Sequence, residues 1–339
     1  MRKLGMLVIA AVLAFATVTV SAAPPPDGPP GLERAIAAQE AHNPRLLNTP
    51  GVAGTAVSLQ ANGKAAVIIF VEHGAMAGLP DLLDGVPVAV EVTGKFIALK
   101  APPSAGSKLS TTSVWPRPVP IGISTGNANE VSAGTIAARV KDASGNVYAL
   151  SNNHVYAREN SAALGEEVLQ PGLYDTGGVY NPANHLGNLS SFVSLNYSGA
   201  PNYVDAAIAS TSAALLDKTT PTSLGGYGVP GSTTTAATVG MAVKKFGRTT
   251  RLTTGTVSAI NASVSVSYEQ GTALFVDQII VRSNKPFIKA GDSGSLLVRN
   301  NTGANPVGLL FAGNANGTFA VANRIDLVLG GFGITIDGK

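Results

Sequence analysis

The chain has 339 residues, of which 45% are hydrophobic and 13% are charged, and its formal net charge is +3. This balance argues against a nucleic-acid or acidic-membrane partner, because such partners require a concentrated basic face. The sequence contains no cysteine, which excludes disulfides, thiolate metal sites and a cysteine nucleophile. Its four histidines show no metal-ligand spacing, so we expect neither a metal nor an organic cofactor.

Residues 1–22 predict a signal peptide. Two basic residues, Arg2 and Lys3, precede an apolar run from Met6 to Val20, and small residues follow it at Ser21 and Ala22. The run is short for a helix that spans a membrane. We therefore expect a secreted or periplasmic protein without stable membrane insertion after the leader is removed. An uncleaved anchor is the alternative.

Residues 23–100 predict a small α+β unit after a proline-rich tether. The apolar spacing from Leu32 to Leu47 predicts an amphipathic helix. Residues 52–59 and 65–71 predict strands around an Asn-Gly turn. Residues 79–83 predict a second helix, residues 86–92 a third strand, and residues 96–99 a further one. This order predicts a small antiparallel sheet with helices on one face.

Residues 101–120 predict a linker, because five prolines and several Ser and Thr residues interrupt any regular element. Residues 121–339 are strand-like nearly throughout, with a short helix expected at residues 325–329. Short strands at regular spacing with turn signals between them predict a mainly β fold, either a sandwich or barrels.

Three residues carry chemistry. His154 follows a strand, Asp205 leads an apolar strand, and Ser293 lies in the turn Gly291-Asp292-Ser293-Gly294. A serine hydroxyl needs a neighbouring base to become a nucleophile, and histidine can take and return a proton near neutrality. A buried aspartate then orients the imidazole and stabilises its charged form.

The glycines beside Ser293 let the backbone turn sharply enough to aim the amides of Gly291 and Ser293 at a developing oxyanion. Each feature alone has a structural explanation, as a histidine at a strand end, an aspartate in a turn or a common turn composition. The three together are more specific, because they follow the order His, Asp, Ser with gaps of 51 and 88 residues.

These motifs resemble the chymotrypsin-like serine peptidases, especially bacterial members without disulfides. Gly-Asp-Ser-Gly is similar to the family's nucleophile motif, and Asn152-Asn153-His154-Val155 is similar to the histidine motif of HtrA-type members. The segments 245–257 and 307–313 resemble strands of α-lytic-type members. The resemblance spans about residues 118–335. It implies a double β-barrel with the active site between the barrels and a serine endopeptidase acting through an acyl-enzyme.

The resemblance also implies roles for other residues. It places Phe287 at the base of a specificity pocket and makes Phe311, Ala312 and Gly313 the strand that binds substrate. It further implies a buried ion pair between Arg248 and Asp292 beneath the oxyanion turn. Three departures are Asn153 where a small residue is usual, Phe311 where a serine is usual, and Arg251 where a glycine is expected.

We therefore expect a monomeric endopeptidase that acts on a protein or peptide. No carboxylate is expected near Phe287, so small or medium apolar side chains are predicted at the cleaved position. Residues 24–117 are expected to be either a pro-domain that assists folding or a permanent accessory domain. A catalytically silent peptide-binding module and an esterase on the same fold are the alternatives for the function.

Overall fold

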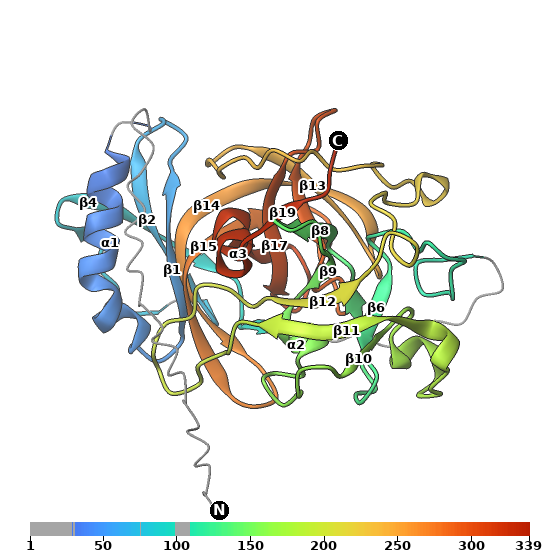
Figure 1. Cartoon of the computed structure of the whole chain (residues 1–339). Helices are drawn as coiled ribbons and strands as arrows, with labels where there is room; N and C mark the ends of the chain where they lie inside the picture. Colours follow the sequence, from blue (N-terminus) through green and yellow to red (C-terminus); the bar gives the residue numbers. More distant parts are fainter. Residues whose placement is uncertain (1–28, 30, 75, 99–108) are drawn as a thin grey trace, which may run out of the picture.

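The computed structural model describes residues 29, 31–74, 76–98 and 109–339. The predicted leader and residues 101–108 of the predicted linker lie outside the described residues. The chain forms two curved sheets beside one another, and a helix and strands from residues 32–92 extend one of them (Figure 1). The prediction of a mainly β fold preceded by a small α+β unit is confirmed.

The first sheet has eight strands in the order β19-β8-β9-β12-β11-β10-β6-β7. Its inner face holds an apolar cluster that includes Ile136, Ala149 and Leu189. A short helix, α2, carries His154 at the end of β9. The elements of this part are β6 (Ser124–Asn127), β7 (Gly134–Thr135), β8 (Ala138–Asp142), β9 (Val147–Ser151), α2 (Asn153–Tyr156), β10 (Glu167–Leu169), η1 (Leu173–Thr176), η2 (Pro182–Asn184), β11 (His185–Phe192) and β12 (Ala207–Thr211).

Six strands of the second sheet close into a barrel. Because β13 pairs with both β16 and β14, the order β13-β16-β17-β18-β15-β14 forms a ring. Its core includes Val257, Phe287 and Leu310. The elements are η3 (Thr222–Leu224), β13 (Ala242–Gly247), β14 (Arg251–Ser267), β15 (Thr272–Arg282), β16 (Leu296–Arg299), β17 (Pro306–Gly313), β18 (Phe319–Arg324), α3 (Ile325–Phe332) and β19 (Ile334–Ile336). The final helix, α3, begins where the sequence predicts it.

The N-terminal unit joins this second barrel through β14. Strand β1 pairs with β14 in antiparallel fashion, and α1 packs against β1 and β2 over a core that includes Leu46, Val57 and Ile69. Strand β14 is long enough to serve both the barrel and the N-terminal sheet (Figure 1). The elements are α1 (Leu32–Leu47), β1 (Val52–Leu59), β2 (Ala65–Val71), β3 (Leu82–Leu83), β4 (Val86–Val92) and β5 (Phe96–Ala98).

Three expectations for the first 120 residues are wrong. Residues 79–83 form no helix; Leu82 and Leu83 instead pair as β3 with the start of β4. The sheet is mixed, because β2 and β4 run parallel. Residues 109–120 pack on the first sheet: Val119 is fully buried and pairs with Leu216. This half of the predicted linker is therefore anchored to the sheet at Val119, although Pro116 and Pro118 are exposed.

No helix within the described part of the chain is long and apolar enough to cross a membrane.

Candidate active site

His154 and Asp205 form a short, buried contact on the first sheet. The Nδ1 of His154 lies 2.6 Å from Oδ2 of Asp205, and the His154 backbone N–H donates to Oδ1 at 3.2 Å. Both side chains are almost fully buried. Because an ionised carboxylate can only accept, Nδ1 carries a proton in this contact, and a neutral imidazole in that tautomer has its lone pair on Nε2. This is the tautomer that a general base requires.

Asparagine side chains hold this pair from both sides. Asn152 Nδ2 donates to the backbone oxygen of Asp205 at 2.7 Å, and Asn153 Nδ2 donates to the backbone oxygen of Val193 at 2.7 Å. Asn153, which the resemblance marks as unusual, therefore fixes the short helix that presents His154. Its amide is buried and bonded, so its size is accommodated by the surrounding loops.

Ser293 approaches from the second barrel. Its hydroxyl donates to the backbone oxygen of Phe311 at 3.2 Å. The Nε2 of His154 is buried and has no hydrogen-bond partner among the described residues. A side chain at Gly134 would contact both Val155, next to His154, and the backbone oxygen of Ser293, so the two segments meet there.

The turn around Ser293 is clamped by the first sheet. The Thr135 hydroxyl donates to the backbone oxygen of Gly291 at 2.8 Å, and the Thr135 N–H donates to that of Ser293 at 2.8 Å. Gly291 and Gly294 have φ values of +91° and +89°, a region that other residues rarely adopt. The backbone therefore favours glycine at both positions of the turn that carries Ser293.

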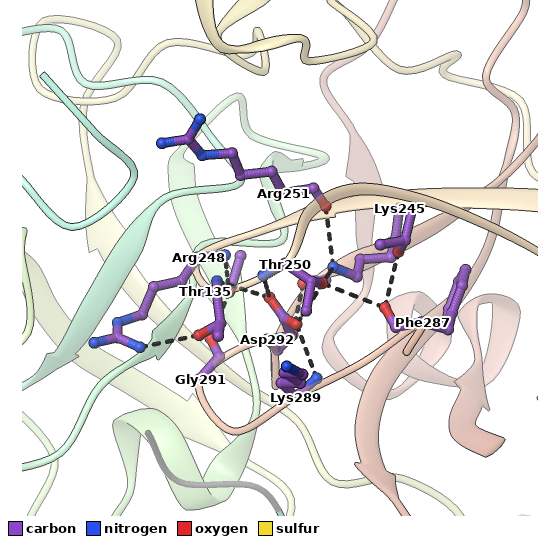
Figure 2. Close-up of polar contacts among 12 residues, drawn as sticks. Thr135, Lys245, Arg248, Thr250, Arg251, Phe287, Lys289, Gly291 and Asp292 are labelled. Carbon is purple, nitrogen blue, oxygen red and sulfur yellow. Dashed lines mark hydrogen bonds and ion pairs between the residues drawn. The ribbon is translucent and has the colours of Figure 1, made fainter. Parts of the chain in front are cut away.

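Asp292 lies beneath this turn and pairs with Lys245. Lys245 Nζ is 3.4 Å from Asp292 Oδ2, and both side chains are fully buried. The carboxylate also accepts from the backbone N–H groups of Thr249 and Lys289, at 2.8 and 2.9 Å. Figure 2 shows Lys245 and Lys289 on two sides of Asp292. Burial lowers the pKa of Lys245, and the Asp292 charge opposes that shift.

The predicted ion pair between Arg248 and Asp292 is wrong. The Arg248 guanidinium forms a two-pronged pair with Asp175 of η1, with Nε 2.7 Å from Oδ2. Arg248 thus reaches toward the first sheet, whereas Lys245 comes to Asp292 from within the second barrel (Figure 2). Each buried carboxylate has its own cation, which is the condition for keeping two such charges inside a protein.

The predicted substrate strand is covered by the N-terminal unit. Strand β5 pairs antiparallel with β17, placing Ala98 opposite Ala312 and Ile97 opposite Gly313. On its other edge β5 pairs in parallel with the end of β14. A segment of this chain therefore lies along the strand where an extended peptide was predicted to bind.

Phe287, predicted at the base of a specificity pocket, is fully buried in the core of the second barrel. Its backbone oxygen accepts from the Thr253 hydroxyl at 2.8 Å. Phe311 is equally buried, with its ring 4.6 Å from that of Phe275. Both side chains are buried in the core, and the polar contacts at these positions are made by the backbone oxygens. A role for Phe287 and Phe311 in binding substrate stays a prediction.

Four residues of the site escaped the sequence analysis: Thr135, Asp175, Lys245 and Tyr268. Lys245 had a usable signal, because Val243 and Lys245 lie on one face of β13 and an inward valine predicts an inward lysine. Thr135 and Asp175 lie in segments without a motif, and nothing in the local sequence singles them out. Tyr268 enters the site through its hydroxyl, which donates to Asp205.

A family model described as the Nal1 C-terminal domain matches residues 229–326, a stretch that contains Ser293 but neither His154 nor Asp205. No curated protein matches the chain by sequence. Among solved structures, the chain is similar to bacterial serine proteases of the chymotrypsin type.

Three of these structures illustrate the similarity. Thermobifida fusca protease A is 18% identical with a TM-score of 0.46, over 65% of this chain and 100% of that one. The Nocardiopsis protease is 20% identical with a TM-score of 0.46, over 64% and 99%. The Cellulomonas bogoriensis chymotrypsin is 23% identical with a TM-score of 0.44, over 65% and 99%.

Proposed function

We propose that this chain is a serine endopeptidase in which His154, Asp205 and Ser293 act as a catalytic triad. The observation that carries the proposal is the 2.6 Å contact between His154 Nδ1 and Asp205 Oδ2, which leaves the imidazole's other nitrogen for Ser293. A buried histidine with one nitrogen bonded to a carboxylate and the other unpartnered has the arrangement of a general base.

In the proposed reaction, His154 Nε2 removes the Ser293 proton as Oγ bonds to the scissile carbonyl carbon. The amides of Gly291 and Ser293 stabilise the oxyanion. His154 then gives the proton to the leaving amine as the carbon–nitrogen bond breaks, leaving an acyl group on Ser293. Water, activated by the same nitrogen, releases the acid and restores the serine.

We further propose that residues 24–117 include a pro-domain. The support is the position of β5, whose backbone occupies the edge of Ala312 and Gly313 that a peptide would use. The core of the N-terminal unit is continuous with that of the second barrel, because Phe70 and Phe96 pack with Phe275 and Phe311. A unit placed this way both blocks the site and supports the barrel beside it.

Export of the protein is proposed only from the sequence pattern of the predicted leader, because residues 1–22 lie outside the described residues. The protein would then act in the periplasm or outside the cell. The preference for small or medium apolar side chains at the cleaved position is likewise kept as a proposal, since Phe287 and Ile288 are both fully buried in an apolar core.

A peptide mixture tests the proposed activity. The processed protein, freed of its N-terminal unit, is incubated with the mixture, and the cuts are mapped by mass spectrometry beside those of Ser293→Ala. We expect internal cuts after apolar residues with the wild type and none with the variant. Cuts that persist in Ser293→Ala would refute the triad, and cuts dominated by Lys, Arg or Glu sites would refute the specificity.

A further inference from the structure

The carboxylate of Asp205 has a third donor, and it comes from the opposite barrel. The Tyr268 hydroxyl donates to Oδ2 of Asp205 at 2.8 Å. The same oxygen accepts from His154 Nδ1, and the other accepts from the His154 backbone N–H. Asp205 is thus held on three sides, and only Tyr268 among these donors is not part of the histidine segment.

Tyr268 is fixed by its place in the fold. It opens the turn between β14 and β15, with its N–H donating to the backbone oxygen of Gly271 at 2.8 Å. Its ring stands edge-on to His154, with centroids 5.9 Å apart. Burial and the Asp205 charge raise the pKa of Tyr268 well above its usual value, so the hydroxyl remains a donor at neutral pH.

The turn that carries Tyr268 is itself pinned to the first sheet. The buried Glu159 carboxylate accepts from the backbone N–H of Gln270 at 2.9 Å. On the other side, Ser267 pairs with Ile97 of β5. The titratable groups around the Tyr268 hydroxyl are Asp205, His154, Glu159 and Tyr197.

We propose that Tyr268 is a positioning residue that orients Asp205 toward His154, which deepens the proposed function and rests on it. Strand β17 cannot supply this hydroxyl, because Phe311 stands where a serine would be expected. Tyr268 supplies it from the β14–β15 turn instead. Its bond restricts rotation of the carboxylate, so Oδ2 stays aligned with the Nδ1 proton when His154 becomes charged during catalysis.

The chain offers a matched control. The Tyr197 ring also packs edge-on to Tyr268, with centroids 5.9 Å apart. Its hydroxyl is buried without a hydrogen-bond partner among the described residues. Tyr268→Phe and Tyr197→Phe therefore remove the same atom from neighbouring rings in one cluster, and only the first breaks a bond to Asp205.

The test reads the His154–Asp205 bond directly in the full chain. The proton on His154 Nδ1 is followed by NMR in wild type, Tyr268→Phe and Tyr197→Phe, and assigned by its absence in His154→Ala. We expect Tyr268→Phe to shift this signal and speed its exchange with water, and Tyr197→Phe to leave it unchanged. An unchanged signal in Tyr268→Phe, or equal shifts in both variants, would overturn the proposal.

Kinetics of the processed enzyme give a second, independent reading. A hydrogen bond to a charged group contributes enough free energy that losing the bond from Tyr268 to Asp205 should lower kcat by about tenfold or more. KM should not change, because Tyr268 acts on Asp205 and not on bound peptide. A loss confined to KM would overturn the positioning role. If the wild type hydrolyses no peptide, the proposed function fails, while the NMR comparison still decides whether Tyr268 orients Asp205.

Discussion

Among single residues, the buried carboxylate of Asp292 beneath the Ser293 turn makes its partners the most costly to replace in free energy of unfolding. Asp292 accepts from Lys289, Thr249 and Thr250 as well as facing Lys245. Such a carboxylate is tolerable inside a barrel only while its cation and its donors are in place. The turn at residues 291–294 therefore depends on Lys245, which pairs with Asp292 beneath it.

Lys245→Met should lower the free energy of unfolding by about 3–5 kcal/mol, because it leaves the buried Asp292 charge without its cation. Adding Asp292→Asn should recover part of that loss, since the uncompensated charge is then removed. Lys244→Met is the control: Lys244 lies next on the same strand, donates to the backbone oxygen of Asn301 and lies over the Tyr227 ring, so its loss leaves Asp292 with its cation. Urea denaturation measures all three. Equal losses for Lys244→Met and Lys245→Met would contradict this account.

The three residues of the proposed triad stand out in the sequence because the proposed chemistry needs particular side chains in a particular order. The partners of the buried charges do not stand out, since they depend on which way a side chain leaves its strand. Arg248 and Lys245 are three residues apart, and only the fold sends one to Asp175 and the other to Asp292.

Among the elements, the turn at residues 291–294 shows why glycine occurs on both sides of Asp292 and Ser293. A methyl group at Gly294 would collide with the Ser151 hydroxyl and with the backbone oxygen of Thr135. The Thr135 backbone cannot move away without breaking the hydrogen bond from its N–H to the backbone oxygen of Ser293. The positive φ adds strain of its own.

Gly294→Ala should therefore abolish turnover and destabilise the protein by clearly more than strain alone. Gly145→Ala is the matched control, because Gly145 has φ +84° but nothing within 4 Å of an added methyl group. Strain alone should cost about 1–2 kcal/mol there. Denaturant midpoints and peptide hydrolysis compare the two variants. If both cost the same and Gly294→Ala retains activity, the steric account is wrong.

Strand β5 should govern access to the site in the full chain. Ile97→Pro removes a backbone donor and disfavours pairing with Gly313, so we expect Ser293 to react faster with small acylating reagents. Ile97→Val keeps a branched side chain and should behave as the wild type. Reaction rates at Ser293, followed by mass spectrometry, compare the variants. No gain with Ile97→Pro would mean that β5 does not limit access.

Element types were mostly readable from periodicity, but two details were not. Residues 79–83 have a helical composition, yet a two-residue bridge to β4 decides their conformation. Phe96–Ala98 reads as a strand, but nothing in it indicates that its partners are β14 and β17. Both outcomes depend on contacts between distant parts of the chain.

At the scale of the whole molecule, the N-terminal unit and the second barrel share one continuous sheet through β1 and β14. Sheets built from pairings this distant in sequence fold slowly. A chain starting at Leu109 should refold poorly, and residues 29–98 supplied separately should restore its activity. Rapid refolding of the truncated chain to full activity would favour a permanent accessory domain.

We propose that Ser293 is a nucleophile activated by His154. Labelling with a fluorophosphonate and mapping the modified peptide tests it most directly, in the processed wild type and in His154→Ala. We predict a single label on Ser293 in the wild type and a rate lower by several orders of magnitude in His154→Ala. A label on another residue, or equal labelling of Ser293 in both proteins, would contradict the account.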